Sequence, residues 1–125
     1  MASEINRVQW RGDSGKRYLY HVLPLPERPK KGLIGNYIFA RISPHHTWVP
    51  IYISHGDLGD PLWGKPWCSR CIEEQGATHL HFRLNSNLFQ RKLEAQDLLE
   101  RYVQVFDPSG CNRHDYDFDP NARNI

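Results

Sequence analysis

Two short motifs of cysteine and histidine have the spacing of metal ligands. The first is Cys68-Ser69-Arg70-Cys71 and the second is Cys111-Asn112-Arg113-His114. Three thiolates and one imidazole are a sufficient set for tetrahedral zinc, so Cys68, Cys71, Cys111 and His114 form a candidate zinc site. The alternative is that Cys71 is a small buried apolar residue and the other residues are incidental, because a C-x2-C within a helix turns its two sulfurs to different faces.

A second candidate surface lies on one expected strand. Between Thr78 and Leu84, the polar residues His79, His81 and Arg83 alternate with apolar residues. Alternate residues of a strand point to opposite faces, which predicts one polar face that can carry positive charge. Together with His55, these side chains are candidate contacts to nucleic-acid phosphates. A solvated sheet face is the alternative, and Arg91-Lys92 is interpreted as a pair of solvated charges.

The composition limits the classes of protein that remain. The chain has 125 residues, of which 39% are hydrophobic and 12% aromatic, enough for one core. No apolar run approaches the roughly 20 residues of a membrane span, and residues 1–10 have no apolar signal segment. An odd number of cysteines, three, predicts a reduced cytoplasmic chain. The net charge of +2 permits nucleic-acid binding without requiring it.

Two hairpins are expected to position these residues. Residues 8–10 and 17–22 flank a turn that contains two glycines, and residues 36–41 and 48–53 flank a second turn. Pro50 cannot donate to a β-ladder, which predicts an edge strand or a bulge. A connector rich in proline separates the two hairpins at residues 23–35.

Two helices are also expected. Pro66 suits the first turn of a helix over residues 67–75, and Gly76 suits its end. Residues 87–103 form the clearest helix, with Ser86 as its N-cap and an apolar stripe of Leu88, Ala95, Leu98, Leu99 and Tyr102. Gln90, Arg91, Asp97 and Arg101 fall mostly away from that stripe. The tail, residues 113–125, is polar and is expected to pack poorly. The elements predict an α+β fold with a small antiparallel sheet.

The order of short motifs carries a family resemblance. Gly35-Asn36-Tyr37 opens one strand, and Tyr52-Ile53-Ser54 closes the following strand, with fifteen residues from Tyr37 to Tyr52. Pro108-Ser109-Gly110-Cys111-Asn112 follows the long helix. Over residues 35–112 this pattern resembles the GIY-YIG nuclease superfamily. The resemblance implies a small sheet flanked by helices, with residues 1–34 as an N-terminal β-hairpin extension and connector. It also implies an endonuclease that hydrolyses phosphodiester bonds with Mg2+ or Mn2+, the metal held by a glutamate.

The resemblance assigns roles to individual residues. Tyr37 and Tyr52 take the tyrosine positions, which orient and activate water, and Asn112 takes the terminal asparagine position. The register departs from the family at the arginine, where Pro61 or Leu62 stands, at the glutamate, where Ala95 stands, and at the last glycine, which is Ser54. Lys65 or Arg70 would replace the arginine, and Glu94 is the nearest carboxylate for the metal.

Two functions therefore compete. The first is a divalent-metal-dependent endonuclease that acts on nucleic acid, DNA being the expected substrate. The second is a catalytically inactive module on the same fold that binds nucleic acid or a protein partner. The position of Glu94 relative to Tyr37 and Tyr52 distinguishes the two.

Overall fold

The computed structural model describes residues 7–117, apart from the side chains of Asp115 and Tyr116. Five strands form one antiparallel sheet in the order β1-β2-β5-β3-β4. The strands are β1 (Arg7–Arg11), β2 (Arg17–Pro24), β3 (Ile34–Ile42), β4 (Trp48–Asp57) and β5 (His79–Leu84). The helices are α1 (Pro66–Glu74), α2 (Leu88–Arg101), the short 3-10 helix η1 (Val103–Val105) and α3 (His114–Asp117).

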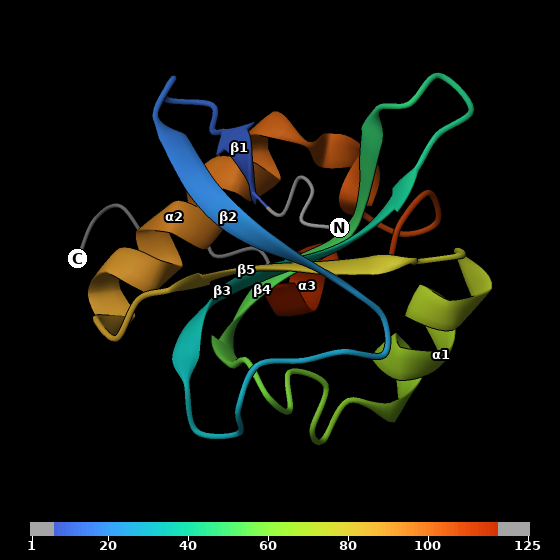
Figure 1. Ribbon diagram of the computed structural model, residues 1–125. Helices are drawn as coiled ribbons and strands as arrows, with labels where there is room; N and C mark the ends of the chain where they lie inside the picture. The colour runs from blue at the N-terminus through green and yellow to red at the C-terminus, as the bar shows by residue number, and fades with distance from the viewer. Residues whose placement is uncertain (1–6, 118–125) are drawn as a thin grey trace.

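Both faces of the sheet are covered, which makes the fold α+β with helices on two sides. Figure 1 shows α2 on one side of the strands and α1 on the other. The core follows this division. One apolar cluster joins Trp10, Tyr20 and Ile38 to Leu98 of α2, and the second joins Tyr37 and Phe39 to Ile72 of α1. Neighbouring residues of β3 therefore belong to opposite sides, as the alternation of a strand requires.

The first two strands are part of the same sheet as the rest. β1 pairs with β2, and β2 pairs in turn with β5 between His21–Phe82 and Pro24–His79. β5 thus lies between the N-terminal strand pair and β3. Because the ladder is continuous, residues 7–24 widen the central sheet by two strands and add Trp10 and Tyr20 to its core.

Local sequence signals account for several features. β4 lies at the edge of the sheet and is bulged opposite Phe39 and Ala40, which confirms the expectation for Pro50. A bulge adds one residue to one strand, so Ile51 and Tyr52 both reach the α1 side. α1 begins at Pro66, also as predicted. Position 35 has to be glycine for a steric reason, because a Cβ there would lie 2.0 Å from the Arg83 carbonyl oxygen of β5.

The long helix differs from its predicted form at both polar and apolar positions. Its N-cap is Asn87, whose side chain accepts from the Gln90 amide at 2.9 Å, so the assignment to Ser86 was wrong. Leu88, placed on the apolar stripe, is 53% exposed. Asp97, placed away from the stripe, is buried. The apolar pattern missed the burial of Asp97 because its hydrogen-bonding partners, Ser14 and Tyr18, lie elsewhere in the chain.

Asp97 holds the β1–β2 turn against α2. Its carboxylate accepts from the Ser14 backbone N–H at 2.8 Å, the Ser14 hydroxyl at 2.7 Å and the Tyr18 hydroxyl at 2.7 Å. Gly12 comes so close that a Cβ on it would lie 2.0 Å from Asp97 Oδ2. A buried carboxylate needs such donors, because its desolvation is otherwise unfavourable.

Replacing Asp97 with Ala should lower the free energy of unfolding by about 2–4 kcal/mol, because three donors lose a charged acceptor in a partly buried position. Gly12→Ala should have a similar effect through the steric clash with the same carboxylate. Urea denaturation followed by circular dichroism measures both changes. Asp13→Ala, at an exposed position in the same turn, is the matched control and should change the free energy by less than about 0.5 kcal/mol. Equal midpoints for Asp97→Ala and Asp13→Ala would contradict this role.

Candidate functional site

Tyr37 and Tyr52 lie side by side on neighbouring strands. Their ring centroids are 6.2 Å apart, and both side chains are buried on the α1 side of the sheet. Tyr37 donates its hydroxyl to the Pro61 carbonyl oxygen at 2.9 Å. Burial raises the pKa of both tyrosines above the ordinary value of 10, so each hydroxyl remains protonated at neutral pH.

Lys65 is the cation that reaches this tyrosine pair. Its Nζ donates to the Tyr52 hydroxyl at 3.0 Å from the position that precedes α1. Of the two replacements considered for the missing arginine, Arg70 instead lies exposed on α1. The sequence interpretation missed Asp117, whose Oδ1 lies 3.4 Å from the Tyr52 hydroxyl. Burial raises the pKa of Asp117. The tail was expected to pack poorly, yet residues 114–117 form α3; residues 118–125 lie outside the described range.

Arg91 contacts His55 at the end of β4, and two lysines carry positive charge near it. Arg91 Nε lies 3.4 Å from His55 Nδ1. Burial, followed by the positive charges of Arg91, Lys65 and Lys92, lowers the pKa of His55 to about 4. His55 is therefore neutral at neutral pH, and its neighbours leave net positive charge around it. We refer to Lys65, Arg91 and Lys92 around His55 as the cationic cluster.

Glu94 lies on the other side of the sheet from the tyrosine pair. Its Oε2 accepts from the Tyr20 hydroxyl at 2.5 Å, and its Oε1 pairs with Arg83 Nε at 3.1 Å. Tyr20 belongs to the core cluster under α2, whereas Tyr37 and Tyr52 belong to the cluster under α1. Glu94 is only 4% exposed, and burial raises its pKa. Glu94 and the tyrosines therefore do not form one cleft.

The expected polar face of β5 is largely covered. His81 is fully buried, accepts a hydrogen bond from Trp10 Nε1 at 2.9 Å, and packs against the Trp48 ring. Burial lowers the pKa of His81 to about 3 and also lowers that of His79, whose ring packs edge-on against Trp48. The assignment of His81 to a cationic surface was wrong, because the β1 strand and α2 cover this side. Arg83 remains partly exposed but is paired with Glu94.

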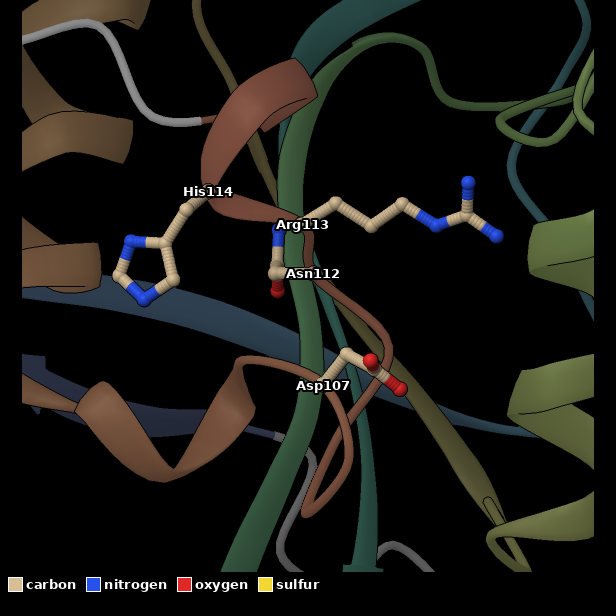
Figure 2. A pocket seen from close by; sticks show the side chains of 4 residues that line it. All are labelled: Asp107, Asn112, Arg113 and His114. Carbon is tan, nitrogen blue, oxygen red and sulfur yellow. The ribbon is translucent and has the colours of Figure 1, made fainter.

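Asn112 fastens the C-terminal segment to β4. Its amide accepts from the Ile53 N–H and donates to the Ile53 carbonyl, both at 2.9 Å, next to Tyr52 in the chain. A hollow of about 330 Å3 lies beside it, and Figure 2 shows Arg113 and His114 leaving its wall in opposite directions. The Arg113 guanidinium lies over the Trp67 ring at 4.1 Å, and His114 stacks on Phe106. Both amide atoms of Asn112 are occupied, so Asn112 acts here as a structural link.

The cysteines pair differently from the zinc hypothesis. Cys71 and Cys111 form a disulfide, which takes up two of the sulfurs that zinc would need and differs from the expected reduced state. Cys68 is a buried free thiol in the core under α1, and its pKa is raised to about 11 by burial. His114 is stacked on Phe106. These four residues do not come together as a metal site.

A divalent metal at Glu94 does not fit the surroundings of that residue. Both carboxylate oxygens already have a partner, Tyr20 or Arg83. Within residues 7–117, no group of three or more His, Cys, Asp and Glu side chains is arranged to hold a metal ion. In the same range, no helix is both long enough and apolar enough to span a membrane.

Comparisons with known proteins leave the site to be interpreted on its own chemistry. No protein-family model matches the chain, and no curated protein or solved structure is significantly similar to it.

The buried histidines predict a loss of stability in mild acid. The pKa values of His81 and His55 are lower in the folded chain than the ordinary 6.5, so only the unfolded chain takes up protons as the pH falls from 6.5 towards 4. Below pH 6.5 these two histidines should therefore lower the free energy of unfolding, by up to about 1.4 kcal/mol per pH unit for His81, whereas the raised pKa values of Glu94 and Asp117 act in the opposite direction. Urea denaturation at a series of pH values measures this slope.

His81→Asn separates this effect from the titration of other groups. Asn does not titrate, and its side-chain oxygen can accept from Trp10 Nε1 as His81 Nδ1 does. The variant should show a shallower slope than the wild type between pH 6.5 and 4, whereas His45→Asn, at an exposed turn position, should keep the wild-type slope. Parallel slopes for His81→Asn and the wild type would exclude His81 as the source.

Proposed function

We propose that this chain is a nucleic-acid-binding protein with a GIY-YIG-like arrangement, and that it binds without cleaving. Three observations carry the proposal: Arg91 contacts His55, Lys65 contacts the Tyr52 hydroxyl, and the exposed Lys92 adds a third positive charge near His55. The order β3, β4, α1, β5, α2 is the one implied by the family resemblance. The closeness of Tyr37 and Tyr52, whose ring centroids are 6.2 Å apart, supports the resemblance.

The cationic cluster has the chemistry of a phosphate site. Lysine and arginine side chains supply most of the affinity of proteins for nucleic-acid backbones, and an arginine fork can hold two phosphate oxygens at once. A neutral His55 can donate to a phosphate oxygen or, through protonation, gain a charge when an anion binds. DNA is the expected ligand, and the net charge of +2 predicts modest affinity.

Exposed aromatic surface accompanies these cations. Trp63 is 77% exposed and precedes Lys65 by two residues in the loop between β4 and α1. Trp67, on the first turn of α1, is half-buried and its ring already carries the Arg113 guanidinium, so Trp63 supplies the exposed ring. Aromatic rings beside cations are the usual surface on which unpaired bases stack. This surface supports single-stranded nucleic acid as the ligand.

The placement of Glu94 supports the proposed lack of cleavage. Phosphodiester hydrolysis with a metal needs an acidic ligand at the scissile phosphate. Glu94 is committed to Tyr20 and Arg83 on the α2 side, and Ala95 stands where the family has its glutamate. The glutamate expected from the resemblance is therefore missing beside the buried tyrosine pair, and the carboxylate that does contact Tyr52 is Asp117.

Lys92→Glu should weaken binding of a labelled single-stranded DNA oligonucleotide about tenfold at low salt and reduce the salt slope by about one unit. Lys92 is exposed, so the variant should fold normally. Arg101→Glu makes the same charge change at an exposed position at the other end of α2 and should leave the affinity within about twofold of the wild type. Fluorescence anisotropy across a salt series gives both quantities. An equal loss of DNA affinity in the two variants would contradict a local site and indicate a general effect of net charge.

Purified protein should leave single- and double-stranded DNA intact with Mg2+ or Mn2+, and Glu94→Gln should behave the same way. Gel electrophoresis of labelled substrate, with a known nuclease as the positive control, measures cleavage. Robust wild-type cleavage that Glu94→Gln abolishes would refute the proposed lack of activity and make Glu94 the metal ligand. Cleavage that Asp117→Asn abolishes would refute it equally and assign the carboxylate role to Asp117, beside Tyr52.

A further inference from the structure

A hollow of about 400 Å3, lined by polar and apolar side chains, lies between the first half of α2 and the β2–β5 side of the sheet. We call it the Arg83 pocket. Its walls come from the start of β2, the end of β5 and the N-terminal half of α2. Sites for small ligands occupy about 300–1,000 Å3, so the hollow has room for one nucleotide unit.

Arg83 presents fixed donors in this pocket. Glu94 holds Arg83 Nε at 3.1 Å, and the guanidinium carbon lies 5.8 Å from the centroid of the Tyr18 ring. In the described part of the chain, the two terminal amino groups of this guanidinium have no hydrogen-bond acceptor. The Arg83 side chain is 39% exposed. A guanidinium held in this way is pre-organised to bind a phosphate with its outer edge, and the exposed Lys16 adds a second positive charge at the wall.

The rim of the pocket offers an aromatic ring and amides. Phe89 is 39% exposed although it is a large apolar side chain. Gln90 is exposed next to it, and Asn85 also lines the pocket. Aromatic side chains stack on bases, and amide side chains read base edges. A phosphate site, a stacking ring and two amides together match a nucleotide better than they match an apolar ligand.

Arg91 connects the pocket to the cationic cluster. Its Nη1 donates to the Asn85 carbonyl oxygen at 3.2 Å, and its Nε lies 3.4 Å from His55 Nδ1. One guanidinium therefore touches a wall residue of the pocket and the central histidine of the cluster. The two positively charged surfaces are neighbours around the N-terminal half of α2.

We infer that the Arg83 pocket is a second nucleotide subsite of the same nucleic-acid surface. A single strand would pass from the cationic cluster across Arg91 to the pocket, where a phosphate meets Arg83 and Lys16 and the adjoining base stacks on Phe89. This inference rests on the proposed nucleic-acid binding and adds to it a path and a base-binding position.

Phe89→Ser tests the subsite with a labelled oligothymidylate in fluorescence anisotropy. Loss of one stacked base should weaken binding about tenfold. Phe89→Trp, which keeps a stacking ring, should bind at least as tightly as the wild type. The matched control is Leu88→Ser, because Leu88 is 53% exposed on the same helix turn and does not line the pocket; it should keep the wild-type affinity. Circular dichroism checks that all three variants fold.

The outcomes separate this inference from the proposed function. Wild-type affinity in Phe89→Ser together with weakened binding in Lys92→Glu would overturn the subsite and leave the cationic cluster as the whole site. Equal losses in Phe89→Ser and Leu88→Ser would also overturn it, because the effect would then follow general surface hydrophobicity. No binding by the wild type at low salt would overturn both proposals.

Discussion

The buried carboxylates of α2 fix the position of that helix. A carboxylate removed from water requires donors or a cation, and its removal leaves those groups unsatisfied. Glu94 finds Tyr20 and Arg83, and Asp97 finds Ser14 and Tyr18, so the donors come from β2, β5 and the first turn. Since a helix has one rotation that satisfies all of them, the remaining side chains of α2 are placed as a consequence. Arg91 is thereby placed to reach His55 on β4.

Two groups of polar side chains lie on opposite faces of the sheet. Hydroxyls, a lysine and a carboxylate gather around Tyr52 on the α1 side, whereas Glu94 and Arg83 are paired on the α2 side. The separation follows from strand parity, because Tyr37 and Ile38 are adjacent and must point apart. A carboxylate that reaches the tyrosines has to come from an element on the α1 side, as Asp117 of α3 does.

The sequence predicts those features that depend on a few adjacent residues. Pro66 starts α1 and Pro50 marks the bulged edge strand, because proline acts through its own ring and its missing N–H. The burial of His81 and Asp97 could not be predicted in this way. Their partners, Trp10 and Ser14, are far away along the chain, and a hydrophobic pattern treats every polar residue as exposed. Asp117 was missed for the related reason that a polar tail gave no sign of packing against Tyr52.

The disulfide between Cys71 and Cys111 joins residues 40 positions apart and closes a covalent ring. The ring contains the whole of α2 and the whole of β5, and β5 lies between β2 and β3. The strand pairs β1–β2 and β3–β4 lie outside the ring, and β5, which belongs to the ring, is the strand that joins them in the sheet. When the disulfide is present, cleavage of the backbone between β5 and α2 would leave the two fragments covalently joined. β5 would then remain attached in the middle of the sheet.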